Sequence, residues 1–187
     1  MQTEKVDLQV RDEGVTPSSE LVANAAKQAR DMLSADVPGN KILTMIAHTA
    51  ESISGEHSVC SILALDGDGL LRNAASPNLP ADYLAAIDRL KPNPRVGTCS
   101  AAAATGLVVV TEDFRADDKW AELRHLPMSL GFAGAWSMPI KTADGKVLGT
   151  LGTYFRERRS PTAEELKNVH VLANAAALVL ARHGMPI

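Results

Sequence analysis

The sequence predicts an α+β fold in which the strands of an antiparallel sheet follow the N-terminal helices and precede the C-terminal helix along the chain. Apolar residues repeat at helical spacing from Ser18 onward and again from Ser160 to about His183. Between these ends, short apolar stretches have a period near two, which is typical of strands. Tight turns at 66–69 and 144–145 join neighbouring stretches, as expected of antiparallel hairpins.

The composition indicates one globular domain with an added arm. The chain has 187 residues, of which 45% are hydrophobic and 22% charged, which excludes a disordered or collagen-like protein. Its formal net charge is −3, and it has only 2 Trp, 2 Tyr and 3 Phe, so neither a basic surface nor a stacking platform for nucleic acid is expected. We expect no nucleic-acid partner and no binding to anionic membranes.

The chain shows no targeting or cross-linking pattern. No apolar run reaches the roughly 18–20 residues that span a bilayer, and the polar start has no signal-peptide pattern. Two cysteines, Cys60 and Cys99, form neither a disulfide framework nor a metal-binding motif. We therefore expect a reduced, cytoplasmic protein without a cofactor or a bound metal.

The first 38 residues are predicted to form a tail and an amphipathic helix, and 39–187 the main domain. Residues 1–17 carry mixed charges without an apolar period, so we expect them to be frayed. A helix follows, with Ser18 and Ser19 as candidate N-caps, and it ends at 37–40. A second helix is predicted from Lys41, with an apolar stripe that ends at Ile53.

The central part of the chain alternates strands with short helices. Asp66 opens a turn rather than a calcium loop, because Leu70 and Pro77 stand where such a loop needs acidic ligands. A short helix is expected to be capped by Thr98 and to end at Gly106. The strands are predicted over 59–65, 70–74, 107–111, 133–140 and 147–155, and the other short helices over 80–90 and from 117 to about 126.

The last helix is apolar around nearly its whole circumference. Leu166, Val169 and Leu180 belong to one stripe, and Leu178 and Val179 extend the apolar surface beyond it. Such a helix needs more than one partner surface. We therefore predict a homodimer in which terminal helices form a bundle between the subunits.

Three segments carry a resemblance to a known family. They are PRVGTCSAAAATGLVVVTED, GAWSMPIKTADGKVLGTLGTYF and RSPTAEE, which together with the order of the elements resemble a bacterial sensory branch of the GAF domains over roughly 40–183. The chain departs from that branch at Ser100, where glycine is usual, and at Ala135, where cysteine is frequent.

The resemblance implies both an architecture and a role. It implies a sheet with the N- and C-terminal helices on one face and short ligand-side helices on the other. GAF domains of this branch are similar to the small-molecule sensors of histidine kinases and cyclic-di-GMP enzymes, and to stand-alone nitrate receptors. We therefore expect a non-enzymatic sensor that binds a small polar or anionic ligand such as nitrate. It would signal through contacts within a dimer or with a partner, either a histidine kinase or a cyclic-di-GMP signalling protein.

The helix that opens at Thr98 is the candidate ligand site. The backbone N–H groups of Cys99, Ser100 and Ala101, together with the helix dipole, favour a small anion. No acidic residue occurs between Arg95 and Thr111 to oppose one. The alternative is that these small residues serve only to pack the helix tightly on the sheet.

Two tryptophans complete the candidate site. Trp136 and Ser137 are neighbours on one strand, so one of them faces the cavity. Trp120 lies on the helix expected to cover that cavity, although a buried tryptophan is also a common core residue.

Other functions stay open at this stage. Cys99 at a helix start has a position suited to a redox switch or a thiol enzyme, but no resolving cysteine or basic partner lies in its motif. A further alternative is a dimerisation module with a closed, empty core. The sequence alone does not choose among them.

Overall fold

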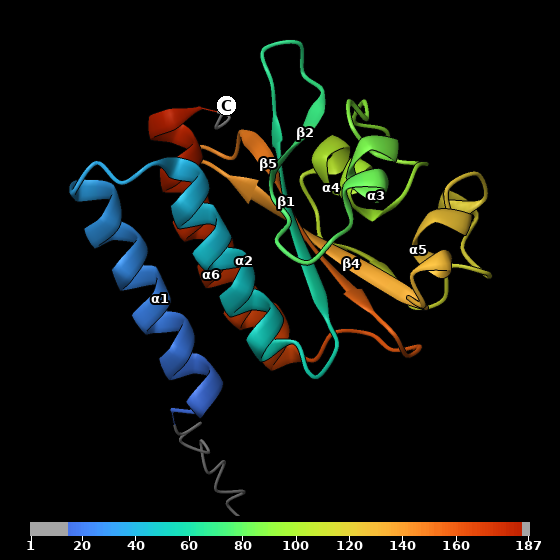
Figure 1. Ribbon diagram of the computed structural model, residues 1–187, viewed down its shortest axis with the longest axis horizontal. Coiled ribbons are helices and arrows are strands. Elements are labelled where there is room, and N and C mark those ends of the chain that lie inside the picture. The colour runs from blue at the N-terminus through green and yellow to red at the C-terminus, as the bar shows by residue number, and fades with distance from the viewer. Residues whose placement is uncertain (1–14, 185–187) are drawn as a thin grey trace, which may run out of the picture.

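The computed structural model describes residues 15–184, which form a five-stranded antiparallel sheet between two layers of helices (Figure 1). The strand order is β2-β1-β5-β4-β3, so the two longest strands lie at the centre and beside it. The α+β prediction is confirmed. The strands are β1 (Val59–Leu65), β2 (Leu71–Ala75), β3 (Val109–Thr111), β4 (Gly134–Lys141) and β5 (Val147–Phe155).

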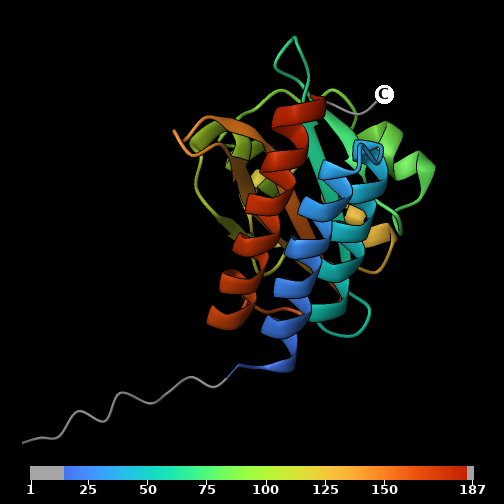
Figure 2. The ribbon, with the colours of Figure 1, turned by 90° about the vertical axis from the view of Figure 1, so that its left-hand side faces the viewer.

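Three long helices lie on one side of the sheet: α2 and α6 pack against the strands, and α1 packs outside them. Figure 2 shows them side by side, with α1 packed on α2 and α6. Their buried residues include many alanines, which let the helices approach one another closely and join the sheet in one apolar core. The helices are α1 (Pro17–Ser34), α2 (Gly39–Ile53) and α6 (Ala163–His183).

Capping boxes fix the starts of α1 and α6. The N-cap of α6 is Thr162, whose hydroxyl accepts from the Glu165 N–H while the Glu165 carboxylate accepts from the Thr162 N–H. The N-cap of α1 is Thr16 rather than Ser18 or Ser19, so both expected caps are wrong. Ser19 is instead the partner of Thr16 in the box.

The expected frayed segment 1–17 falls mainly on residues 1–14, which lie outside the described residues. Thr16 and Pro17, by contrast, form the start of α1. The Thr16 hydroxyl also donates to the Glu164 carboxylate in the first turn of α6. The beginnings of the two helices are therefore joined side by side, and α1 and α6 run in the same direction.

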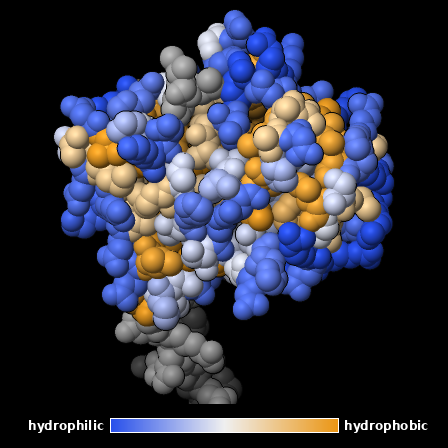
Figure 3. All heavy atoms as spheres, viewed as in Figure 1, coloured by the Kyte–Doolittle hydropathy of each residue, from blue (hydrophilic) through white to orange (hydrophobic). Residues whose placement is uncertain are grey.

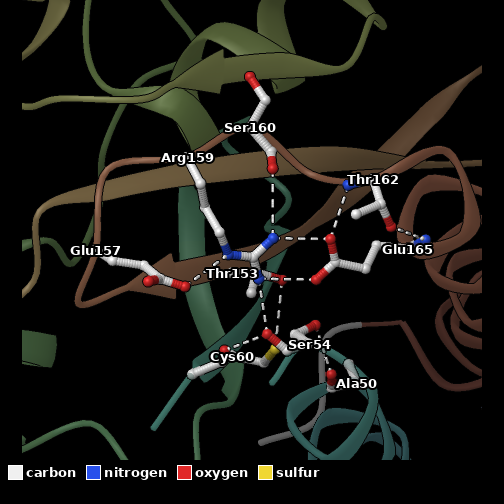
Figure 4. Close-up of polar contacts among 10 residues, drawn as sticks. Ala50, Ser54, Cys60, Thr153, Glu157, Arg159, Ser160, Thr162 and Glu165 are labelled. Atoms are coloured by element: carbon white, nitrogen blue, oxygen red, sulfur yellow. Dashed lines mark hydrogen bonds and ion pairs between the residues drawn. The ribbon is translucent and has the colours of Figure 1, made fainter. Parts of the chain in front are cut away.

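One guanidinium joins the end of β5, the start of α6 and the end of α2 (Figure 4). Arg159 donates to both carboxylate oxygens of Glu165 and to the Ser54 carbonyl, each at 2.8 Å, and lies 4.0 Å from the centre of the Phe155 ring. Burial alone would raise the pKa of Glu165, but the hydrogen bonds from Arg159 and from the Thr162 N–H outweigh it and lower that pKa. The first turn of α6 is thereby held against the sheet.

Short helices cover the opposite face of the sheet, as the expected architecture requires. They are α3 (Ala81–Ala86), α4 (Thr98–Thr105), the 3₁₀ turn η1 (Asp118–Trp120) and α5 (His125–Ser129). The single helix expected from Asp117 through Leu126 is wrong, because the chain forms η1, a turn and then α5. Figure 3 shows hydrophobic residues among hydrophilic ones over α3 and α5. Half-buried side chains of this layer include Leu84, Leu126, Met128 and Leu130.

Two boundaries on this face differ from the sequence prediction. The N-cap of α4 is Gly97, with φ +56°, and Thr98 is the first helical residue rather than the cap. The third strand is shorter than predicted, and the two residues before it, Leu107 and Val108, are exposed. Gly106 does end α4 in the left-handed conformation, as expected.

The last helix is less exposed than its apolar circumference suggested. Leu172 and Val179 are buried in the core beneath it, whereas Val171 and Leu178 are exposed at 37% and 48%. Within residues 15–184, no helix combines the length and the apolar character needed to cross a membrane.

Candidate functional site

The start of α4 packs directly on the middle of the sheet. The first four residues of the helix, Thr98 to Ala101, are all buried. The Cys99 sulfur lies 3.1 Å from the Ser137 hydroxyl oxygen, and that hydroxyl donates to Thr98 Oγ1 at 2.9 Å. A Cβ on Gly152 would lie 2.8 Å from the Cys99 sulfur, so only glycine allows this close approach.

Two further hydroxyls lie on this face without partners. Ser61 pairs with Gly152 across β1 and β5, and Thr150 lies two residues earlier on β5, on the same face. Both side chains are fully buried, and neither hydroxyl has a hydrogen-bond partner within residues 15–184. A buried hydroxyl without a hydrogen bond costs folding free energy, so the two hydroxyls are unusual in the packed interior and make this face of the sheet polar.

The thiol in the middle of these hydroxyls is neutral. Burial raises the pKa of Cys99, although the hydrogen bond with the Ser137 hydroxyl acts in the opposite direction. A buried, protonated thiol is a weak nucleophile. Cys60 faces the other core across the sheet, so the two cysteines cannot form a disulfide in this arrangement. The geometry therefore does not favour a thiol enzyme or a disulfide switch.

A small cavity of about 20 Å³ lies beside the start of α4. Its volume is sufficient for about one water molecule. The lining residues come from the sheet, α3, α4 and the segment around η1, and none of them carries a formal charge. They are Leu63, Tyr83, Ile87, Leu90, Val96, Gly97, Thr98, Cys99, Ser100, Trp120, Leu123 and Tyr154.

Trp120 covers this cavity. Its side chain is 4% exposed, its ring lies over Gly97, and it contacts the Phe114 ring at 4.5 Å between centroids. The indole Nε1–H has no acceptor within the described part of the chain. An unsatisfied donor in the wall of a cavity is a position where a polar ligand gains a hydrogen bond.

Trp136 and Ser137 lie on opposite faces of β4. Ser137 is the one that faces α4, where it contacts Cys99 and Thr98. Trp136 is fully buried in the core formed with the long helices, so it does not line the cavity. The sequence left open which of these two neighbours faces the cavity side of the sheet, and in the structure it is Ser137.

The backbone donors of α4 differ by one residue from the expected set. The Gly97 N–H donates to the Lys119 carbonyl at 2.8 Å. Because α4 begins at Thr98, the groups without helical partners are those of Thr98, Cys99 and Ser100, while the Ala101 N–H makes the first intrahelical bond. Ala101 contributes small size rather than a free donor.

The sequence analysis expected only the backbone N–H of Ser100 to contribute to the site, and it missed Tyr83 and Tyr154. The Ser100 hydroxyl donates to the Lys91 carbonyl at 2.8 Å and accepts from the Asn93 N–H, so it anchors the preceding loop. Tyr83 donates to the Tyr154 hydroxyl at 3.0 Å, and their rings meet edge to face in the cavity wall. The position of Tyr154, two residues after Gly152, was the signal for its facing direction.

The described residues hold no group of three or more His, Cys, Asp or Glu side chains that could bind a metal ion. The groups of the cavity wall that can form hydrogen bonds are the indole, the hydroxyls and the backbone N–H groups.

Comparison with known proteins places the chain in a family. A family model described as GAF domain matches residues 40–181. The chain is 29% identical over 142 residues to the "Methyl sulfide methyltransferase-associated sensor" of Methanosarcina acetivorans. That alignment covers 75% of this chain but 14% of the relative, so the chain spans about one seventh of its length.

Solved structures share the same fold at low identity. The GAF domain of a phosphoenolpyruvate-protein phosphotransferase from Coxiella burnetii has a TM-score of 0.71 and 17% identity, with 89% of this chain and 96% of that one covered. A domain of a putative two-component sensor histidine kinase from Sinorhizobium meliloti has a TM-score of 0.63 and 18% identity, over 76% and 90%. Since the family model matches most of the chain, this protein belongs to the GAF domain family.

Proposed function

We propose that this GAF domain is a non-enzymatic sensor that binds a small polar or anionic ligand between α4 and the segment around Trp120. A relative that is named a sensor supports the sensory role. The observation that carries the ligand site is Trp120, which lines the cavity at the start of α4 and whose buried Nε1–H has no acceptor within residues 15–184. The cavity wall has no carboxylate to repel an anion.

The donors around the cavity determine what it can bind. The free N–H groups at Thr98, Cys99 and Ser100 and the positive end of the α4 dipole suit an oxyanion or a carbonyl oxygen. The neutral Cys99 thiol does not oppose either ligand. Because no lysine or arginine lines the cavity, nitrate or another small oxyanion would be held by dipoles alone, whereas a neutral polar ligand costs less to desolvate.

Ligand entry requires a movement of the segment that carries Trp120. A volume of about 20 Å³ holds about one water and is too small for the four heavy atoms of nitrate. The segment is held by Asp117, which accepts from the Thr111 hydroxyl at 2.6 Å and from Lys119 Nζ at 2.9 Å. Binding would therefore select a conformation in which residues 117–130 are displaced. The binding free energy of the ligand would stabilise that conformation.

The output is proposed to pass through helices on the other face. A homodimer through the exposed side of α6, and from there a histidine kinase or cyclic-di-GMP signalling protein in the cytoplasm, are the proposed partners. Val171 and Leu178 supply exposed apolar contacts seven residues apart on that helix. The whole activity of the longer relative is not carried over to this chain.

The test replaces Trp120 by Phe and uses Trp136→Phe as the matched control. Both changes remove an unsatisfied buried indole N–H, but on opposite faces of the sheet. A thermal-shift screen of nitrate, other anions and small metabolites identifies a ligand, since binding to the native state raises the midpoint. Calorimetry then measures its affinity for each variant.

We expect Trp120→Phe to weaken binding at least about tenfold, equivalent to about 1.4 kcal/mol. Trp136→Phe should bind the ligand as the unmodified chain does. Each substitution should cost about 0.5–3 kcal/mol of stability, so stability alone does not distinguish them. Equal affinities in the two variants would place the ligand elsewhere, and a screen in which nothing raises the midpoint would favour a dimerisation module.

A further inference from the structure

A basic groove lies outside the proposed ligand site. It has a volume of about 290 Å³ and is formed where the loops after β3, before β4 and after β5 meet. Its charged residues are Arg115, Arg156, Arg158 and Asp113, a formal charge of +2 on a chain whose formal net charge is −3. None of its lining residues belongs to the cavity beneath Trp120.

Two of the three guanidinium groups have no carboxylate partner. Arg158 Nε lies 3.0 Å from Asp113 Oδ2. Among residues 15–184, Arg115 and Arg156 form no ion pair. The groove therefore holds two positive charges that no acidic side chain of the described residues compensates.

Arg156 is held in place by its surroundings. Its Nη1–H donates to the Leu130 carbonyl at 2.7 Å, and its guanidinium lies 4.9 Å from the centre of the Phe132 ring. Gly131 has φ +81°, and a Cβ there would lie 2.7 Å from Arg156 Nη1. The turn therefore leaves room for this guanidinium, whose other N–H groups have no partner within the described residues.

We propose that this groove binds a phosphoryl group. The planar guanidinium offers pairs of parallel N–H donors that match the oxygens of phosphate, and it is more weakly hydrated than an ammonium. A dianion compensates the formal charge of +2 in the groove. The volume is small for a whole nucleotide and suits a single phosphate, either free or carried as a phosphomonoester.

The Arg124 side chain connects the groove to the segment that carries Trp120. Arg124 donates to the Arg115 carbonyl at 2.7 Å and also to the Trp120 carbonyl at 3.4 Å. Arg115 and Trp120 are therefore joined through one side chain. The proposal does not depend on the ligand site, since it rests on separate residues.

The experiment titrates the full chain with inorganic phosphate by calorimetry, at an ionic strength fixed at about 0.15 M with chloride. Arg115→Gln and Arg156→Gln should each weaken phosphate binding about three- to fivefold. The Arg115 side chain has no partner in the described residues, so this variant keeps the fold. Arg30→Gln on α1 removes the same charge from an exposed helix and should leave the affinity unchanged.

Asp113→Asn should strengthen binding, because it removes the carboxylate that competes for Arg158. A phosphoserine peptide, compared with its serine counterpart and with free phosphate, identifies the source of the group. Tighter binding of the phosphopeptide than of free phosphate assigns the groove to a modified partner protein, and equal binding assigns it to the free ion. Absence of saturable binding by both probes, or an equal loss in Arg30→Gln, would overturn the proposal.

Discussion

The two faces of the sheet are built from different chemistry. The face under α1, α2 and α6 is packed mainly with alanine and branched aliphatic side chains. The face under the short helices contains a thiol, several hydroxyls and two tyrosines, and it is covered by helices of eight residues or fewer. Three of the four unsatisfied buried side-chain groups within residues 15–184, Ser61, Thr150 and Trp120, lie on this second face.

Under the proposed function, this difference separates the face that stabilises the fold from the face that binds the ligand. Long helices bury continuous apolar stripes and supply most of the packing energy. Short helices bury less apolar surface, and the unsatisfied donors beneath them are where the proposed ligand would gain hydrogen bonds. Trp136 is the exception, because its indole N–H is unsatisfied within the packed face.

The largest expected effect compares one leucine from each face. Leu172 of α6 is fully buried, whereas Leu123 lies half-buried after η1. Leu172→Ala should cost about 2–5 kcal/mol of unfolding free energy, because it leaves a cavity among rigid helices. Leu123→Ala should cost less than about 2 kcal/mol. Urea unfolding measures both, and equal losses would contradict the distinction between the faces.

A second, intermediate effect tests the contact between α4 and the sheet. In Gly152→Ala the added methyl would lie 2.8 Å from the Cys99 sulfur, so α4 must shift at a cost of about 1–3 kcal/mol. Adding Cys99→Ala removes the obstructing sulfur, and the two changes should then couple by about 0.5–3 kcal/mol in the favourable direction.

Gly67→Ala is the control for this test, since nothing lies within 4 Å of its added methyl. It should leave stability nearly unchanged. Thermal unfolding of the unmodified chain, Gly152→Ala, Cys99→Ala and the double variant gives the coupling free energy. Additive losses would show that Cys99 and Gly152 do not limit the approach of α4.

The smallest effect on stability concerns the exposed side of α6. Leu178→Glu should change the unfolding free energy by no more than about 0.5 kcal/mol, because the side chain is 48% exposed. If α6 forms the dimer, the variant should nevertheless have half the molar mass in light scattering. Leu107→Glu makes the same change on an exposed loop and should leave the mass unaltered.

Two results would contradict the proposed interface. One is an unmodified chain that is already monomeric, and the other is a Leu178→Glu chain that remains dimeric. Val179 cannot serve in this test, although it is next to Leu178 in sequence, because it is 1% exposed and a charge there would disrupt the core.

Much of the architecture follows from patterns that lie within single elements. The 147–155 strand agrees with the structure at both ends, and the helix expected from Ser160 to about His183 begins at Ala163 and ends at His183. Periodicity was less informative where tertiary contacts decide the backbone. Gly97 caps α4 because its N–H meets the Lys119 carbonyl, a residue far along the chain.

The candidate site was predictable in its location but not in its details. Thr98, Cys99 and Ser100 do line a cavity, and Ala101 is buried beside them. Their hydroxyl partner Ser137 needed the facing direction of β4, which neighbouring residues of a uniformly buried strand do not reveal. The unsatisfied Trp120 N–H could not be predicted either, because it depends on acceptors that are missing from surrounding loops.

The placement of the two tryptophans gives the molecule a built-in optical reporter. They are the only tryptophans of the chain, and the sheet separates them. In a Trp136→Phe chain the remaining emission arises from Trp120, which is buried against Phe114. Exposure of that indole to water would shift its emission to longer wavelength. The emission wavelength would therefore report the position of residues 117–130 without an attached dye.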